Sequence, residues 1–178
     1  LIHGGGRLAT TMAERLGIST QMVEGRRITD ADTLQVVTMV YGGLVNKQVV
    51  AQLQARGINA IGITGADMNF MLANKRPEKN GIDYGFVGDV VATQGQMLLQ
   101  LTEQGITPVI APLTHDGKGT LLNTNADTMA GETAKALAKC SDRDVALTFC
   151  FEKPGVLSNP DDDTSVIREI TLDTYDSL

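Results

Sequence analysis

The chain has 178 residues, of which 42% are hydrophobic, and a formal net charge of -6. This composition is typical of a globular protein and excludes a disordered chain, and no apolar run approaches the roughly 20 residues of a membrane-spanning helix. Lys75, Arg76 and Lys79 form the densest group of cations, which is too small for a phosphate-backbone binder, so we expect neither nucleic acid nor a membrane as a partner.

Cysteine and histidine are scarce. Cys140 and Cys150 lie ten residues apart without a CxxC pattern, which indicates free thiols in a reducing compartment and therefore a cytoplasmic protein. The two histidines, His3 and His115, are far apart in sequence, so we assign no metal site built from protein ligands.

The first third of the chain begins with a strand-like segment. Residues 1–3 resemble the end of a buried strand, residues 4–6 form a glycine turn, and residues 8–16 have helical spacing. Residues 21–28 predict a short hairpin around Gly25. A capping Thr29-Asp30 pair then predicts a long helix over residues 30–56.

The middle of the chain alternates strands and helices. Residues 59–64 predict a buried strand, and residues 71–75 and 85–91 predict two strands that flank the polar turn RPEKNG. A helix is expected over residues 93–105, followed by a buried strand at residues 108–111.

The last part of the chain contains an Ala-rich helical pattern at residues 125–139 and a strongly apolar strand pattern at residues 144–151. A surface turn at residues 161–163, a short strand at residues 167–170 and a helix from residue 172 complete the predictions. This alternation indicates an α/β architecture with a largely parallel sheet. Because the first strand and the last helix are short, we expect the chain to be incomplete at both ends.

A strand, a glycine turn and a helix together form a general anion site, since helix-start N–H groups are unpaired and glycine lets an anion approach the backbone. The Walker pattern is absent. A dinucleotide pattern, Gly4-x-Gly6-x-x-Ala9 with Glu24 further on, fits only partly because Glu24 falls in the predicted hairpin. A purely structural turn is the third interpretation.

Three ordered motifs separate these alternatives: IHGGG at the start, EGRRITD about twenty residues later, and NTNAD at residues 123–127. Together they resemble the amino acid kinase family, and within it the branch that phosphorylates N-acylated glutamate. Gly43-x-x-Asn46-Lys47, the segment GFVG at residues 85–88 and the segment KPG at residues 153–155 extend the resemblance over nearly the whole chain.

The resemblance implies a three-layer α/β sandwich with a mainly parallel central sheet. Residues 1–142 would form the lobe for acyl-amino-acid binding and dimerisation, and residues 143–178 the start of a nucleotide-binding lobe. The helix from Asp30 to Gln54 would pair two copies into a homodimer, as the equivalent helix does in the family.

The implied reaction transfers the γ-phosphoryl group of ATP to the side-chain carboxylate of an N-acylglutamate, a step of arginine biosynthesis. ATP would bring Mg²⁺ as its substrate complex, and no tightly bound cofactor is expected. The nucleophile is already an anion, so positioning and charge neutralisation suffice. The sequence leaves the acyl group open, acetyl or succinyl, and also arginine feedback and any assembly beyond the dimer.

The resemblance assigns roles to individual residues. The backbone N–H groups of Gly5 and Gly6 would contact the migrating phosphoryl group, and Gly4 would complete this loop. Arg27 would grip the α-carboxylate, for which a guanidinium fork is suited, and Asn123 would hold the substrate. The residues alone predict a solvated pair of arginines at Arg26 and Arg27, and a turn residue at Asn123. Asp127 would orient two active-site lysines or, read alone, favour the positive end of a helix dipole.

Two further groups follow from the resemblance. Phe86, Val87 and Gly88 would form a hairpin lid that closes over the substrate, although Phe86 also fits plain sheet packing. Glu152 and Gly155 would contact the nucleotide, but the segment FEKPG departs from the family pattern, which has an aspartate near Glu152. His3 is expected to be a packed loop histidine.

The family's two active-site lysines, in a K-x-GG segment and in a later G-M-x-x-K segment, have no counterpart in residues 1–178. We therefore expect the chain by itself to be inactive and the full-length protein to supply both. The alternatives are a carbamate, aspartate or glutamate kinase, a non-catalytic regulatory homologue, and a nicotinamide or flavin enzyme.

Overall fold

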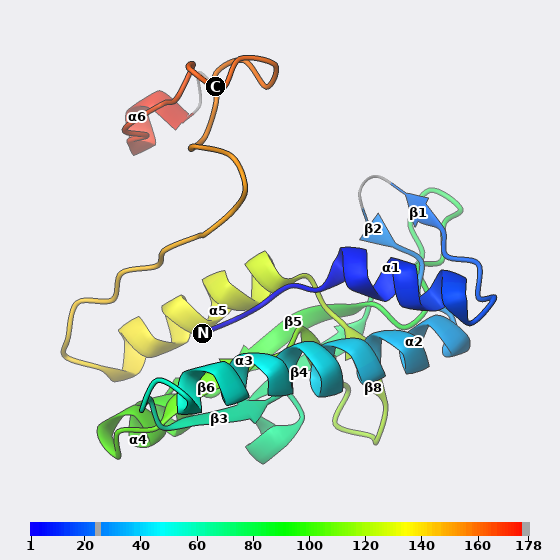
Figure 1. Ribbon diagram of the computed structural model, residues 1–178, viewed down its shortest axis with the longest axis horizontal. Coiled ribbons are helices and arrows are strands. Elements are labelled where there is room, and N and C mark those ends of the chain that lie inside the picture. The colour runs from blue at the N-terminus through cyan, green and yellow to red at the C-terminus, as the bar shows by residue number, and fades with distance from the viewer. Residues whose placement is uncertain (24–25, 176–178) are drawn as a thin grey trace. The chain divides into compact units, whose positions relative to one another are not determined.

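The computed structural model describes residues 1–23 and 26–175 (Figure 1). The chain divides into two compact units, Leu1–Ala146 and Leu147–Leu178. The first unit holds all the described strands and every described helix except α6. The assignment of binding functions to residues 1–142 and 143–178 stays a prediction.

The secondary structure follows the predicted order over most of the first unit. The helices are α1 (Gly6–Arg15), α2 (Ala31–Val37), the π-helix η1 (Thr38–Val45), α3 (Asn46–Gln54), the 3₁₀ turn η2 (Asp67–Asn69), α4 (Gly95–Glu103), α5 (Ala126–Cys140) and α6 (Leu172–Tyr175). The strands are β1 (Met22–Val23), β2 (Arg26–Arg27), β3 (Ala60–Ile63), β4 (Met71–Lys75), β5 (Gly88–Thr93), β6 (Thr107–Ile110), β7 (Leu113–His115) and β8 (Leu121–Asn123).

Parallel pairs lie at the centre of the strand arrangement. Strand β3 pairs parallel with β6, and Ile2 adds a parallel bridge to Ile110 of β6. A four-stranded sheet has the order β5-β4-β7-β8, in which β4 and β7 are parallel and the two outer pairs are antiparallel. The predicted α/β class is confirmed.

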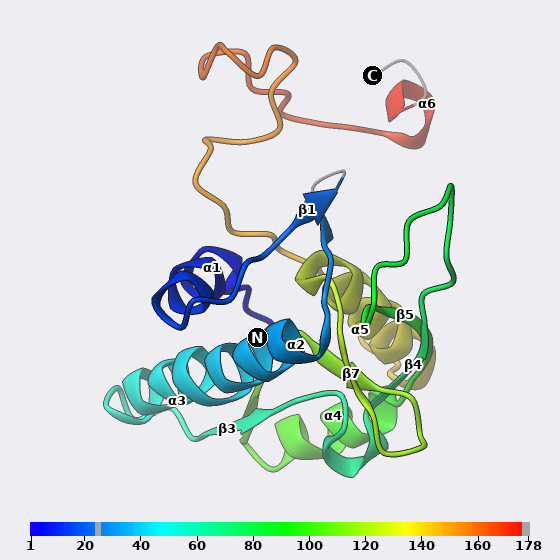
Figure 2. The ribbon, with the colours of Figure 1, turned by 90° about the vertical axis from the view of Figure 1, so that its right-hand side faces the viewer.

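Two hydrophobic clusters hold the helices against the strands. One joins α1 and the helix α2–η1 to the start of β7, through residues such as Ala13, Val37 and Leu113. The other joins β3, β4 and β6 to α4 and α5, through residues such as Met71 and Met129. Helices therefore cover the strands on both sides, with α2 and α3 on one side and α4 and α5 on the other (Figure 2).

The long helix predicted over residues 30–56 is present, but it is not α-helical throughout. Asp30 caps it, with Oδ1 accepting a hydrogen bond of 2.7 Å from the backbone N–H of Thr33. Helix α2 then passes into the π-helix η1 before α3 continues to Gln54. A π-helical turn holds more residues than an α-helical turn, so it changes which side chains face the strands.

The Asp30 cap predicts a pH dependence of stability. The hydrogen bond from Thr33 lowers the pKa of the Asp30 carboxyl below its usual value of 3.8. A lowered carboxyl pKa contributes stability that is present above about pH 4 and is lost as the pH falls through the folded-state pKa. Asp30→Asn keeps a capping oxygen without a charge. Urea unfolding at pH 7 and pH 3 should therefore show a smaller loss of stability in D30N than in the wild type, and equal losses would contradict this.

Several predictions were wrong or incomplete. Residues 144–151 form no strand, and the side chains of Val145, Leu147, Phe149 and Phe151 are exposed. An apolar pattern makes a strand only where a neighbouring strand supplies hydrogen bonds, and no described strand pairs with this segment. Residues 167–170 are also not a strand, because pairing here is limited to a single bridge between Leu157 and Val166.

Other differences concern boundaries. The short strands β7 and β8 were not predicted, and β5 begins at Gly88, three residues later than expected. The predicted hairpin of residues 21–28 is confirmed by the antiparallel pair β1–β2. Its expected tip, Glu24 and Gly25, lies outside the described residues.

Candidate functional site

A cavity of about 230 Å³ opens beside the start of α1. Its walls come from the glycine turn, the β1–β2 hairpin, the π-helix, the β4–β5 and β6–β7 connections, and the segment from the end of β8 to the start of α5. The lining residues are Gly4, Gly5, Gly6, Met22, Arg26, Arg27, Tyr41, Val87, Pro112, Asn123, Thr124, Asn125 and Ala126. Among the described residues, the wall contains two arginines and no acidic side chain, and this balance favours an anion.

The glycine turn supplies part of this preference. Helix α1 begins at Gly6, and its N-cap, Gly5, has no side chain to cap the first N–H groups. These N–H groups and the positive end of the helix dipole attract negative charge. A Cβ atom on Gly4 or Gly6 would meet no atom within 4 Å, whereas one on Gly5 would stand 2.9 Å from Cδ1 of Tyr41. Gly5 therefore allows a close contact between the turn and the π-helix.

Arg27 is the most deeply buried cation of the cavity wall, with 8% of its surface exposed. Its Nη2 donates to the Gly6 carbonyl oxygen at 3.1 Å and to Oγ1 of Thr10 at 2.8 Å. Its Nη1 is buried without a hydrogen-bond partner. A buried guanidinium with an unused donor is costly unless an anion pairs with it. The structure thus places a free donor beside the glycine turn.

Asn123 lies at the end of β8 and also lines the cavity. Its Nδ2 donates to Oγ1 of the fully buried Thr29 at 3.0 Å. Its backbone N–H donates to the Phe86 carbonyl oxygen at 2.8 Å, and Val87 forms a parallel bridge with it. With Nδ2 engaged, the side-chain oxygen remains to accept a hydrogen bond from a ligand.

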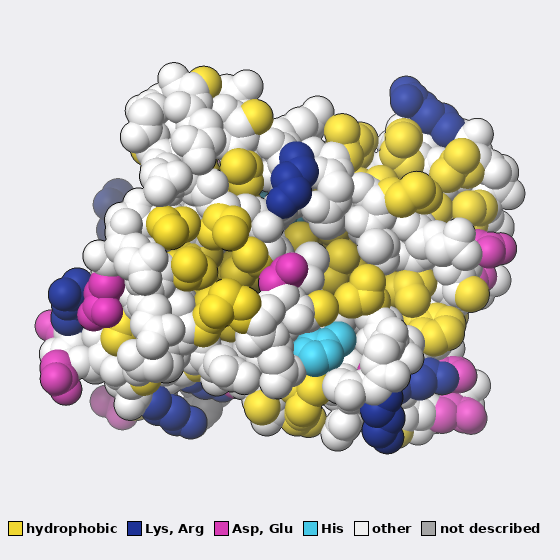
Figure 3. Space-filling view, turned by 90° about the horizontal axis from the view of Figure 1, so that it is seen from below, with side chains coloured by type: hydrophobic (Ala, Val, Ile, Leu, Met, Phe, Trp, Pro, Cys, Tyr) yellow, Lys and Arg dark blue, Asp and Glu magenta, His cyan; other side chains and the backbone are white. Residues whose placement is uncertain are grey.

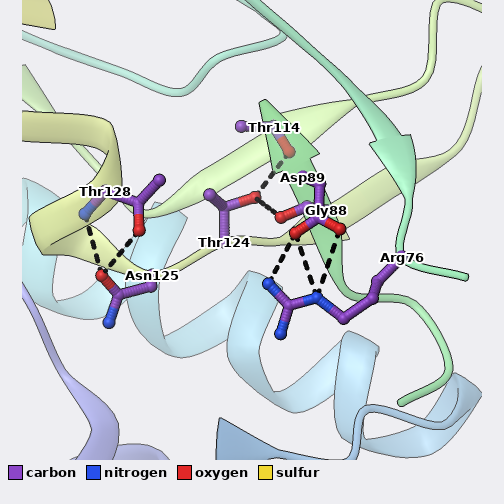
Figure 4. Close-up of polar contacts among 7 residues, drawn as sticks. All are labelled: Arg76, Gly88, Asp89, Thr114, Thr124, Asn125 and Thr128. Carbon is purple, nitrogen blue, oxygen red and sulfur yellow. Dashed lines mark hydrogen bonds and ion pairs between the residues drawn. The ribbon is translucent and has the colours of Figure 1, made fainter. Parts of the chain in front are cut away.

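Thr124 of this wall forms a buried pair with Thr114 (Figure 4). Oγ1 of Thr124 lies 2.7 Å from Oγ1 of Thr114 and 3.4 Å from the Gly88 carbonyl oxygen. A Cβ atom on Gly88 would stand 2.7 Å from both hydroxyl oxygens, so glycine is required for this packing. Next to Thr124, Asn125 caps α5 by accepting a hydrogen bond of 2.8 Å from the Thr128 N–H.

The predicted lid residues differ in position. Val87 lines the cavity, Gly88 packs behind its wall, and Phe86 is half-buried without lining it. An ion pair joins Arg76, the residue after β4, to Asp89 of β5. The distance from Nε of Arg76 to Oδ1 of Asp89 is 3.0 Å (Figure 4). The closing motion stays a prediction.

Asp127 does not line the cavity. Asp127 is exposed in the first turn of α5. Glu152 and Gly155 belong to the second unit, Leu147–Leu178. The roles of all three stay predictions.

Tyr41 is the main residue of the cavity wall that the sequence did not single out. It is only 5% exposed and lies in the π-helix. Burial raises the pKa of its hydroxyl, and the adjacent Arg27 side chain acts in the opposite direction. The only signal for it was that Tyr41 is the single aromatic residue between positions 31 and 54. Met22, Pro112, Thr124 and Ala126 were also missed.

His3 packs beside the glycine turn. Its Nδ1 lies 2.7 Å from the Gly4 carbonyl oxygen, and its Nε2 lies 3.3 Å from Nδ2 of Asn46. A neutral ring with the proton on Nδ1 satisfies both contacts. Partial burial lowers the pKa of His3 and so favours that neutral form. These contacts fit a packed loop histidine.

Three surface and composition features complete the description. Among residues 1–23 and 26–175, no group of three or more His, Cys, Asp or Glu is arranged to hold a metal ion. No helix in the same residues is long and apolar enough to span a membrane. On the face shown in Figure 3, Lys and Arg side chains are scattered among hydrophobic groups.

Sequence comparisons place these features in a known context. The model of the amino acid kinase family matches residues 1–178. The chain is 62% identical over 178 residues to an acetylglutamate kinase of Cytophaga hutchinsonii, which covers all of this chain and 67% of that protein. It is 64% identical over 171 residues to an acetylglutamate kinase of Bacteroides thetaiotaomicron, with coverages of 96% and 65%. The chain thus spans about two thirds of the length of these relatives.

Solved structures agree on the fold. The structure of smu.665 from Streptococcus mutans superposes with a TM-score of 0.71 at 28% identity and covers 77% of this chain and 55% of that one. An N-acetylglutamate synthase from Neisseria gonorrhoeae superposes with a TM-score of 0.67 at 23% identity, covering 77% of this chain and 31% of that one. The second likeness concerns the fold alone.

Proposed function

Because the chain belongs to the amino acid kinase family, we propose that the full-length protein transfers the γ-phosphoryl group of ATP to the side-chain carboxylate of an N-acylglutamate. The family match confirms the predicted family and its phosphotransferase class. The substrate is suggested by the relatives named acetylglutamate kinase. The proposed setting is arginine biosynthesis in the cytoplasm.

The unpaired Nη1 of buried Arg27, beside the glycine turn, is the observation that carries this proposal. The substrate has two carboxylates, of which one is fixed and the other reacts. Arg27 would hold the α-carboxylate through its free donor, and the side-chain oxygen of Asn123 would accept the N–H of the acylated amino group. The reacting carboxylate would then lie toward the N–H groups of Gly5 and Gly6.

Phosphoryl transfer at this position needs little covalent help. The attacking carboxylate is ionised at neutral pH, so no base has to remove a proton. The N–H groups at the start of α1 would stabilise the charge that spreads over the phosphoryl oxygens. Mg²⁺ would arrive with ATP, held mainly by phosphates. Asp127 would orient the two lysines that the family resemblance assigns outside residues 1–178, and closure over Val87 would exclude water.

An assay of the full-length protein tests this function. The protein is incubated with Mg²⁺-ATP and, separately, with N-acetylglutamate, N-succinylglutamate, glutamate, aspartate or carbamate. Hydroxylamine traps an acyl phosphate as a hydroxamate, and ADP release reports turnover. We expect turnover with an N-acylglutamate, and the better of the two identifies the acyl group. Turnover with the other acceptors alone would place the protein in another branch, and acceptor binding without ADP release would indicate a regulatory homologue.

We also propose that two copies pair through the helix from Asp30 to Gln54. Met39 and Leu44 of this helix are 56% and 39% exposed, which leaves apolar surface that a second copy would cover. Leu44→Glu should therefore convert a dimer into a monomer in analytical ultracentrifugation of the full-length protein. A wild-type protein that sediments as a monomer at micromolar concentration would contradict the proposal.

A further inference from the structure

Tyr41 links the two halves of the site without belonging to any of the motifs that identify it. We propose that Tyr41 is a positioning residue that holds both the Gly5 turn and the Arg27 guanidinium in place. This inference rests on the proposed function for its kinetic consequences, whereas its structural part can be tested without catalysis.

The contact with Gly5 is tight and is made by the ring. A Cβ atom on Gly5 would stand 2.9 Å from Cδ1 and 3.0 Å from Cε1 of Tyr41, so the ring lies directly against the turn. The ring itself is packed in a cluster with Ala9 and Ala13 of α1. Because the ring lies against the turn and belongs to the cluster that buries α1, it limits how far the Gly5 N–H can move.

Tyr41 and Arg27 both line the cavity, so the phenol and the guanidinium belong to the same wall. Burial raises the pKa of the Tyr41 hydroxyl, and Arg27 opposes this rise through its charge and a side-chain hydrogen bond. Arg27 also donates through Nη2 to Gly6 and Thr10. The hydroxyl therefore adds a further restraint on a guanidinium whose Nη1 must meet the ligand.

The π-helix explains how one residue reaches both groups. Tyr41 lies in the middle of η1, and the neighbouring Gly42 packs against Leu113 and Thr64. The wide turn lets the helix bury Val40 and Tyr41 in succession while Gly42 stays close to the strands. π-Helical geometry inside a helix is rare and is often found at functional sites.

The ring and the hydroxyl predict separable effects in the full-length protein. Tyr41→Phe keeps the ring, so it should raise the KM for the N-acylglutamate about tenfold and leave kcat within about twofold. Tyr41→Leu removes the ring as well, so kcat should also fall by about tenfold. Amide hydrogen exchange at residues 4–8 should be faster in Y41L and unchanged in Y41F.

Val37→Ala is the matched control, because Val37 is buried in the same cluster and does not line the cavity. It should lower Tm, as Y41L does, without changing KM or the exchange of residues 4–8. A Y41F protein with wild-type KM, or a Y41L protein whose exchange matches V37A, would overturn the positioning role while leaving the proposed function intact. If the wild type phosphorylates no N-acylglutamate, the proposed function fails, and the exchange comparison still decides the role of Tyr41.

Discussion

Replacing Arg27 by lysine should raise the KM for the N-acylglutamate about 100-fold, with a much smaller change in kcat. The loss of a charge-assisted hydrogen bond to a buried partner costs about 1.5–3 kcal/mol, which corresponds to roughly 10- to 150-fold in affinity. Lysine keeps the charge but has no planar fork, so it cannot bind Gly6 and Thr10 through one nitrogen and the substrate carboxylate through another. Steady-state kinetics with the acceptor varied at saturating ATP measures the effect.

The control for this change is Arg15→Lys. Arg15 lies in the last turn of α1, is exposed, and does not line the cavity. The R15K protein should therefore have the acceptor KM of the wild type. A normal KM in R27K would show that the buried guanidinium does not anchor the acceptor, and the assignment of the cavity would then fail.

Gly5→Ala should lower kcat about 100-fold. The new methyl group would stand 2.9–3.0 Å from two ring carbons of Tyr41, closer than real Cβ contacts. Since the ring is buried and packed, the turn has to move, and its N–H groups move with it. A displacement of about 1 Å at a reacting centre can cost about 100-fold in rate. Single-turnover kinetics with saturating ATP and acceptor isolates this step.

Gly131→Ala is the control, because it makes the same chemical change at a position where kcat should not depend on it. Gly131 lies in α5, and a Cβ atom there would meet no atom within 4 Å. We expect an unchanged kcat and a gain in stability of about 0.5–1 kcal/mol, because alanine favours the helix. If G5A kept the turnover of G131A, the backbone of the turn would not be part of the catalytic site.

Local sequence patterns predicted most of the fold because they report local physics. The helix cap at Asp30, helical spacing and the short β1–β2 hairpin depend on neighbouring residues, and all are present. The strand predictions were less accurate than the helix predictions. Residues 144–151 have a strong strand pattern and form no strand, whereas β7 and β8, three residues each, were missed. A strand depends on a partner that is distant in sequence, which a local pattern does not reveal.

For the site, too, the sequence predicted some features and the packing of distant segments determined the others. The order of IHGGG, EGRRITD and NTNAD was enough to identify the family and to select the glycine turn, Arg27 and Asn123. Six sequence-distant segments then meet at one cavity, and only their packing determines which residues line it. Asp127, although part of a motif, does not line it.

By itself, the sequence determined the α/β class, the helix caps and the family, since these rest on local preferences and on motif order. Tertiary structure decided that Arg27 and not the adjacent Arg26 is buried, because the Arg27 guanidinium packs on Gly6 and Thr10 of α1. It also brought Tyr41 of the π-helix against Gly5 and into the same cavity wall as Arg27. Such contacts depend on how the helix packs on α1 and the strands, so they arise only when the whole unit has folded.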